Sequence, residues 1–230
     1  DSAKAIENPL NIQPASDQEP AADEASPGQE VVVPLPQLSE SDEPFKQDVT
    51  GLSNNLNPWL NTNQLITKYL KIVNDASQGQ RQFKHMRFLK PSEPFTTQQD
   101  ERGLYIDPQS YRRYDELAAA VDAMDVQATL NVYKKYRPLY QQVFTAFGYP
   151  EQYQIEDIFK KTAAIILEAP IIEERIYLVR PTVRYKFKNK QLENLDPLQK
   201  QMIRMGPINT RIIQHKVRLM VEALVNQENL

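Results

Sequence analysis

Apolar residues repeat with the 3.6-residue period of an amphipathic α-helix through most of the chain after residue 60. The first stripe follows Asn61 and Gln64, a cap with a glutamine at the third position. The next two follow Asp107 and Asp125, whose side chains can accept hydrogen bonds from free backbone N–H groups. The pattern therefore predicts helices over residues 61–79, 107–124, 125–147, 155–169, 196–205 and 207–224.

Pro138 lies inside the longest of these predicted helices. An interior proline costs a helix about 3 kcal/mol because it removes a backbone hydrogen bond and clashes with the preceding turn. Packing must therefore stabilise a bend at Pro138, or the segment forms two helices. The sequence leaves both possibilities open.

Residues 182–188 alternate between apolar and basic side chains, which is typical of a β-strand. Val183, Tyr185 and Phe187 would share one face, and Arg184 and Lys186 the other. Looser alternation over residues 83–89 and a short apolar run over 104–106 indicate a further β element. Together the patterns predict one α-rich α+β domain of about seven helices with a small antiparallel sheet.

The first 44 residues differ in composition from the rest. They carry ten acidic residues, one basic residue, seven prolines and no aromatic residue. Such a segment cannot bury enough apolar surface to offset the entropy of ordering, so we predict a disordered linker over 1–44, with Val31 to Val33 loose, and a single domain over 45–230. The linker's charge of −9, subtracted from the total of −3, leaves +6 on the domain, which favours anionic partners.

Several chemistries lack the residues that they need. The six glycines are all isolated, so neither a P-loop nor a dinucleotide-binding fingerprint is present. With no cysteine, disulfides, thiolate metal sites and cysteine nucleophiles are excluded. We expect no cofactor and no metal site. The chain has no apolar run near 18 residues and begins at Asp1, so we expect a signal sequence or membrane anchor to precede it in a longer precursor.

The two histidines and several carboxylates are the side chains in this sequence that acid–base catalysis could use. His215 borders a packed stripe of the last helix, so we expect a half-buried structural residue there. His85 falls on a strand face beside Arg87 and is a candidate binding residue. Glycosidase-type hydrolysis needs two facing carboxylates, which the sequence cannot demonstrate. The acidic residues considered for it are Asp107, Asp115, Glu173 and Glu174.

Basic residues are interleaved with aromatic ones around His85, residues 111–114 and residues 184–187. This mixture binds phosphates or sugars in some proteins, but it is also typical of a half-buried element with a solvated face. Arg112 and Glu116, four residues apart, would pair along a helix and favour the second interpretation. The candidate ligand-binding residues are His85, Arg87, Arg112, Arg113 and Arg184.

The two predicted helices on either side of Gly206-Pro207 are rich in basic residues, as in a DNA-binding helix-turn-helix. The turn is tighter than the usual three or four residues, and Ile208 and Ile212 occupy the start of the would-be recognition helix. We therefore expect no nucleic-acid partner.

Three blocks, HMRFLKP near His85, LYIDPQSYRRYDEL from Leu104 and DPLQKQMIRMGPINTRIIQHKVR from Asp196, resemble the proteobacterial family named domain of unknown function 3014. The resemblance spans residues 35–224 and implies a single membrane anchor, a low-complexity linker and a domain outside the inner membrane of a Gram-negative cell. It implies no catalytic residue. The matching positions are His85, Arg87, Tyr105, Asp107, Tyr111, Arg112, Arg113, Tyr114, Asp115, Arg204, Gly206, Pro207 and Asn209.

These observations predict a non-enzymatic periplasmic domain, anchored to the inner membrane, that binds an envelope protein or a cell-wall component. A flexible linker of this length would give a typical reach of about 35 Å. An anion- or glycan-binding domain that uses the five candidate residues is the first alternative. A carboxylate-dependent hydrolase is the second.

Overall fold

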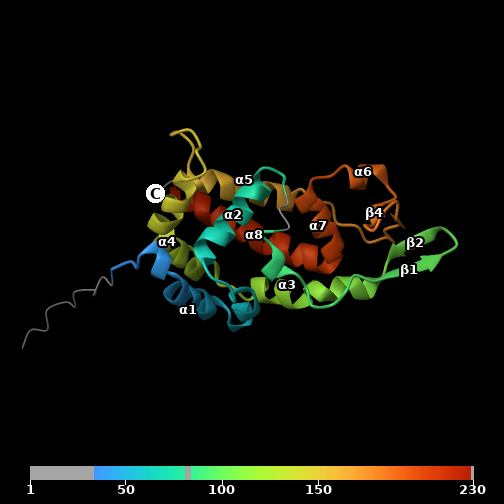
Figure 1. Ribbon diagram of the computed structural model, residues 1–230, viewed down its shortest axis with the longest axis horizontal. Coiled ribbons are helices and arrows are strands. Elements are labelled where there is room, and N and C mark those ends of the chain that lie inside the picture. The colour runs from blue at the N-terminus through green and yellow to red at the C-terminus, as the bar shows by residue number, and fades with distance from the viewer. Residues whose placement is uncertain (1–33, 81–83, 229–230) are drawn as a thin grey trace, which may run out of the picture. The chain divides into compact units, whose positions relative to one another are not determined.

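The computed structural model describes residues 34–80 and 84–228, whose arrangement is drawn in Figure 1. Predictions for residues 1–33, including the loose run at 31–33, lie outside the described residues. Residues from Leu35 onward form one compact unit. Its first elements are the 3₁₀ helix η1 (Leu38–Glu40) and α1 (Asp42–Leu52), so the predicted boundary between residues 44 and 45 falls inside α1.

The described residues contain eight α-helices and two small antiparallel strand pairs, which confirms the predicted α-rich α+β class. After α1 come α2 (Leu65–Ser77), α3 (Asp115–Asp122), α4 (Val126–Thr145), α5 (Ile155–Leu167), α6 (Lys190–Glu193), α7 (Pro197–Met205) and α8 (Pro207–Glu228). Short 3₁₀ helices lie between them: η2 (Asn54–Trp59), η3 (Arg87–Leu89) and η4 (Pro108–Tyr114). α4 continues through Pro138, so this segment is not split into two helices.

The main apolar cluster lies among α1, α2, α4 and α5, at the left of Figure 1. Tyr136 of α4 is fully buried in it, and its ring meets the edge of Phe45 with the centroids 5.0 Å apart. The Tyr136 hydroxyl donates to a carboxylate oxygen of Asp48 at 2.8 Å. Because burial without a partner would be costly for the hydroxyl, this bond lets tyrosine occupy the centre of the cluster.

α2 begins differently from the prediction. The backbone N–H groups of Gln64 and Leu65 donate to the two carboxylate oxygens of Asp42, at 2.6 and 2.8 Å. Asp42 therefore caps α2 from the start of α1, and the prediction that Asn61 and Gln64 form a local cap is wrong. α2 ends as predicted near Gly79, whose φ of 67° is a conformation that glycine adopts without strain.

α8 runs beside α3, α4, α5 and α7. A second cluster of buried side chains lies between these helices, and its members are Ala118, Ala169, Met202, Met205 and Ile213. The cap predicted at Asp125 is found, since Asp125 accepts the N–H of Ala128 at 2.6 Å at the start of α4. The helix predicted from residue 196 is α7, and Asp196 forms a capping box with Gln199 at its start. These local signals were predicted correctly because each acts within one helical turn.

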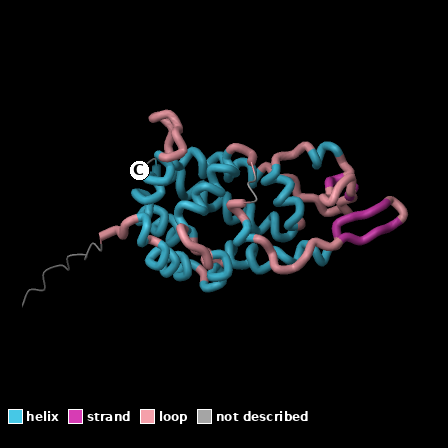
Figure 2. Tube along the Cα trace, viewed as in Figure 1, coloured by secondary structure: helices cyan, strands magenta, loops and turns pink. Residues whose placement is uncertain are grey.

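The two strand pairs lie at the same end of the compact unit, drawn in magenta in Figure 2. β1 (Thr97–Asp100) pairs with β2 (Gly103–Ile106), and β3 (Leu178–Val179) pairs with β4 (Lys186–Phe187). A bridge between Tyr105 and Tyr177 joins the pairs, and the N–H of Ile106 donates to the carbonyl of Ile176 at 3.0 Å. A third cluster holds this end together; its buried members are Ile106, Ile176, Leu178, Phe187 and Ile203.

One predicted strand is much shorter than expected, and another is absent from the described residues. Of residues 182–188, only Lys186 and Phe187 form strand structure, and Val183 is 84 % exposed instead of sharing a buried face with Phe187. Residues 84–89 form turns and η3 rather than a strand. Residues 182–185 and 84–89 have no partner strand alongside, and an unpaired extended segment gains no ladder hydrogen bonds.

Candidate binding groove

An apolar groove of about 610 Å³ lies between η4, residues 172–175 and the start of α8. Its apolar lining is formed by Ile106, Tyr111, Ile172, Met205, Ile208 and Ile212. Ile208 stands at this site with 69 % of its surface exposed, in the first turn of α8. A concave apolar surface with a large exposed aliphatic side chain and polar groups around it is typical of a site that receives a ligand or a partner.

The groove depends on a tight elbow between α7 and α8. Gly206 forms the elbow with a φ of 84°, which favours glycine. A Cβ atom at this position would lie 2.5 Å from Cγ of Tyr111, closer than real contacts allow. The missing side chain thus lets the elbow pack directly on the ring of Tyr111, and the ring forms part of the groove.

Asn209 ties the elbow to η4 and α3. Its side-chain amide nitrogen lies 3.0 Å from the carbonyl of Tyr111, 2.9 Å from Oδ1 of Asp115 and 3.0 Å from the carbonyl of Met205. Asn209 is only 3 % exposed, so these acceptors satisfy a buried donor group. Since Tyr111 and Asn209 are 98 residues apart in sequence, the contact fixes two distant segments in one geometry.

Most charged side chains around the groove are paired with one another. Arg112 lies 3.8 Å from Asp115, and Glu173 forms an ion pair with Arg211. Glu174 is exposed and, in the part of the chain that the structure describes, has no ion-pair partner. The groove therefore combines apolar walls with one unmatched negative charge.

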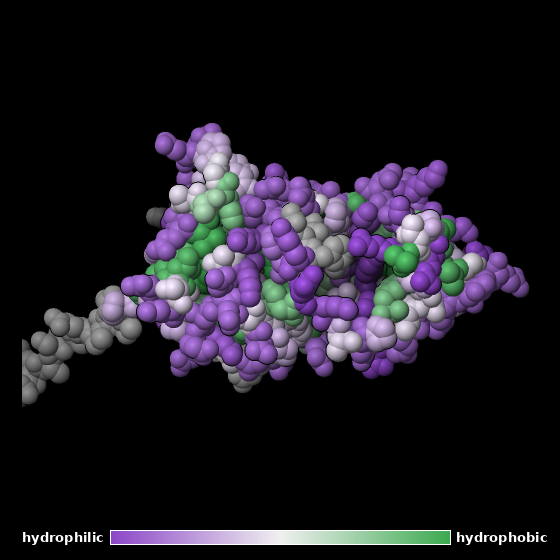
Figure 3. All heavy atoms as spheres, in the orientation of Figure 1, coloured by the Kyte–Doolittle hydropathy of each residue, from purple (hydrophilic) through white to green (hydrophobic). Residues whose placement is uncertain are grey.

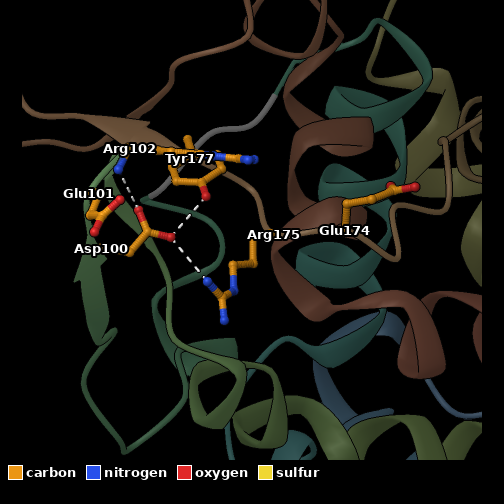
Figure 4. A pocket seen from close by; sticks show the side chains of 6 residues that line it. All are labelled: Asp100, Glu101, Arg102, Glu174, Arg175 and Tyr177. Carbon is orange, nitrogen blue, oxygen red and sulfur yellow. Dashed lines mark hydrogen bonds and ion pairs between the residues drawn. The ribbon is translucent and has the colours of Figure 1, made fainter.

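Arg175 joins the groove to a polar hollow beside the β1–β2 turn, shown in Figure 4. In this hollow Asp100 accepts hydrogen bonds from the Arg175 guanidinium at 3.1 Å, the Tyr177 hydroxyl at 2.9 Å and the Arg102 backbone N–H at 2.8 Å. Figure 4 shows Arg175 and Tyr177 directed at Asp100, while Glu174 points away from them. The cluster holds the segment before β3 against the first hairpin.

The electrostatics of this cluster favour its charged form. Desolvation raises the pKa of Asp100, but the hydrogen bonds from Tyr177, Arg102 and Arg175 outweigh it and bring the pKa below the ordinary value. The pKa of Arg175 is raised, through its interactions with Tyr105 and Asp100. In the groove, burial raises the pKa of Tyr111 to about 12. Each of these groups keeps its usual charge at neutral pH.

The structure distributes the five predicted ligand-binding residues over three regions. His85 precedes η3, and its Nδ1 lies 2.7 Å from Asp75 of α2. Arg113 donates from Nε to the carbonyl of Ser110 at 2.8 Å and lies over the ring of Phe95. Arg87 is exposed in η3, and Arg184 is exposed between β3 and β4. Of the five, only Arg112 lines the groove.

The structure also shows where His215 and the acidic residues considered for catalysis lie. His215 is exposed, which corrects the expectation of a half-buried residue, because α8 turns Gln214 and Lys216 inward on either side of it. Asp107 acts as a cap by accepting the N–H of Gln109 at 3.0 Å. Asp115, Glu173 and Glu174, which were considered for a hydrolase, all line the same groove from different elements.

Arg175, Asp100 and Tyr177 were missed by sequence reasoning. Arg175 and Tyr177 lie 75 and 77 residues from Asp100, and residues 170–178 have no period that assigns them to an element. Gly206 and Asn209 had a signal, because both fall in the block that carries the family resemblance. Across residues 34–80 and 84–228, no three histidine, aspartate or glutamate side chains are grouped as metal ligands. No described helix is both long and apolar enough to cross a membrane.

The fold and the groove define a class: an α-rich α+β domain with an apolar groove at a helix elbow. The sequence model of the family described as "Protein of unknown function (DUF3014)" matches residues 65–220, and the chain belongs to this family. The match includes η4, α3, α7 and the start of α8, which together form most of the groove. Comparisons with curated proteins and with solved structures found no match.

Proposed function

We propose that this chain is a non-enzymatic protein-interaction module whose groove binds an extended segment of a partner protein. The observation that carries the proposal is the apolar groove at the α7–α8 elbow, with Ile208 69 % exposed in it. An aliphatic side chain of a partner would gain about 25 cal/mol for each Å² of apolar surface removed from water there. Glu174, exposed and unmatched among the described charges, favours a lysine or arginine next to that side chain.

The ionisable groups support binding rather than catalysis. General acid–base chemistry works best with a pKa near the working pH, whereas the pKa of Asp100 is lowered and that of Tyr111 is raised to about 12. Asp115 is held by Asn209 and Arg112, and Glu173 by Arg211. Asp115 and Glu173 therefore make contacts within the fold that hold their side chains in place.

The wider setting is part of the same proposal. We place the module in the periplasm, tethered to the inner membrane by the acidic, proline-rich segment that precedes the compact unit and by an anchor before that segment, with an envelope protein or cell-wall component as its partner. The linker composition and the family resemblance support this placement. A reporter fused after Leu230 in the full-length precursor tests the compartment, and activity of a cytoplasm-specific reporter would contradict it.

The groove can be tested with a random peptide library displayed on phage and the purified chain as bait. We expect selected peptides to combine an aliphatic residue with a neighbouring lysine or arginine. Ile208→Asp should abolish their binding without changing stability, and Glu174→Lys should reverse the charge preference. Val183→Asp is the matched control, because Val183 is also highly exposed but does not line the groove. Equal binding by the Ile208 and Val183 variants would overturn the proposal.

A hydrolase remains the second candidate, because Asp115 and Glu174 line the same groove. Retaining and inverting glycosidases act through two carboxyl groups that flank the bond to be cleaved. Incubation of the purified chain with peptidoglycan fragments, followed by mass spectrometry of the products, tests it. Products that disappear with Asp115→Asn and with Glu174→Gln would favour the hydrolase, and unchanged fragments would remove it.

A further inference from the structure

The β3–β4 hairpin is the most basic part of the described chain. Residues 175–192 contain six basic residues and no acidic residue. Arg175 is bound to Asp100, and Lys188 donates from Nζ to the carbonyl of Arg102 at 3.0 Å. The five basic residues other than Arg175 lie in or beside the hairpin, and each is exposed. They are Arg180, Arg184, Lys186, Lys188 and Lys190.

The same hairpin exposes apolar side chains at its tip. Val183 is 84 % exposed and Val179 is 40 % exposed, whereas Leu178 and Phe187 are buried in the cluster beneath. Figure 3 shows small apolar patches within a largely hydrophilic surface over the end that carries β4. Val183 lies between Arg180 and Arg184 in sequence, so an uncovered aliphatic side chain is flanked by positive charges.

The buried residues fix this arrangement. Leu178 pairs with Phe187 and Val179 with Lys186, which directs one pair to the interior and the other to solvent. The guanidinium of Arg180 lies 5.2 Å from the centroid of the Tyr185 ring, and this ring packs against Phe95 at 5.5 Å. The hairpin is thus anchored from beneath, while Val183 at its tip and the basic residues along it are exposed.

We propose that the β3–β4 hairpin is a docking surface for an anionic lipid bilayer. Basic side chains are attracted to negatively charged headgroups, and an aliphatic tip gains free energy by entering the boundary between headgroups and acyl chains. A single-stranded nucleic acid would instead need open aromatic faces for stacking, and the Tyr185 ring is half-buried between Arg180 and Phe95. This inference is independent of the groove, because none of the hairpin residues 178–188 lines it.

Sedimentation with vesicles tests the docking surface. The purified chain is mixed with vesicles of phosphatidylcholine alone and with vesicles of equal parts phosphatidylcholine and phosphatidylglycerol. We expect binding to the anionic vesicles, weak binding to the neutral ones, and a loss of affinity as salt is added. Absence of binding to the anionic vesicles would overturn the proposal.

Charge-reversal variants show whether the hairpin is the surface that binds. A basic residue near an anionic membrane contributes about a fivefold factor in affinity, so Arg180→Glu with Lys186→Glu should weaken binding more than about tenfold. Lys134→Glu with Lys161→Glu is the matched control, since both lysines are exposed on α4 and α5 and the net charge changes equally. Equal weakening by the two pairs would mean attraction by net charge alone and would overturn the proposal.

The variant Val183→Ser distinguishes binding to a bilayer from binding to a soluble polyanion. We expect it to weaken binding to anionic vesicles by about fivefold, because the apolar contact is lost, and to leave binding to dextran sulfate unchanged. If Val183→Ser left both affinities unchanged, the hairpin would be a site for anionic polymers and the bilayer proposal would fail. Unchanged circular dichroism and unfolding midpoints confirm that each variant is folded.

Discussion

The α-carbon of Gly206 faces the ring of Tyr111 so closely that an added methyl group would lie 2.5 Å from Cγ of that ring. Gly206 also has a φ of 84°. We expect Gly206→Ala to lower the free energy of unfolding by about 3 kcal/mol or more, because strain and overpacking add. Gly148→Ala is the control, with a φ of 72° and no atom within 4 Å of the added Cβ. Urea unfolding of both variants should show a clearly smaller loss for Gly148→Ala.

Asn209→Asp should destabilise the same elbow although the two side chains have nearly the same shape. The amide nitrogen faces two backbone carbonyls and the carboxylate of Asp115. Replacing the donor by a carboxylate leaves these acceptors facing another acceptor, at a cost of about 2–4 kcal/mol. Chemical denaturation measures the loss. A variant as stable as the unmodified protein would show that these contacts contribute little.

Glu156 of α5 makes stability depend on pH. Its side chain accepts from Arg137 Nε at 2.7 Å and from the Tyr133 hydroxyl at 2.5 Å. Desolvation raises the pKa of Glu156, but these hydrogen bonds outweigh it and the pKa lies below its ordinary value. The stabilisation is therefore complete above the unfolded pKa of about 4.3 and is lost as the pH falls through the lower folded pKa.

Glu156→Gln tests this dependence. We expect the variant to lose about 1–2 kcal/mol of stability near pH 7, where the carboxylate is charged in the unmodified protein. The difference between the two proteins should shrink below about pH 4, because the carboxyl group is then increasingly protonated. Urea unfolding at several pH values measures both the loss of stability near pH 7 and its decrease at low pH. A difference that did not change with pH would contradict the assignment.

Pro138→Ala should stabilise the chain. Pro138 is exposed within the continuous helix α4 and cannot donate a backbone hydrogen bond to the preceding turn. Alanine restores the donor and has the highest helix propensity, although it also gives the unfolded chain more freedom. We expect a gain of about 1–3 kcal/mol in the free energy of unfolding, measured by thermal or urea denaturation. A loss of stability would show that α4 requires a bend at this position.

Local chemistry explains which parts of the fold could be predicted. Asp107, Asp125 and Asp196 cap the helices that directly follow them, so the information lies within a few residues. The cap of α2 could not be predicted in this way, because Asp42 acts across 22 residues. Residues 182–188 have the period of a strand, but the chain supplies a partner only for Lys186 and Phe187.

The groove was less accessible to sequence reasoning than the helices. Tyr111, Gly206 and Asn209 stand in blocks with a family resemblance, but nothing local indicates that they meet. Arg175 lies in a segment without helical or strand periodicity and gains its role by reaching Asp100. The five basic residues predicted to bind a ligand did not gather in one place. They lie on three separate segments of the fold: η3 with the turn before it, η4, and the loop before β4. Convergence of side chains is a property of tertiary contacts.

The apolar interior is divided, and this has a consequence for motion. The cluster around Ile106, Ile176 and Phe187 is separate from the larger cluster around Tyr136. Regions held by few buried contacts open more often than the rest of a fold, and they do so as cooperative units. The backbone amides of β3 and β4 should therefore exchange hydrogen with solvent through local openings that leave the helices folded. The end of the domain that carries the strands can then change its conformation when it contacts a binding surface.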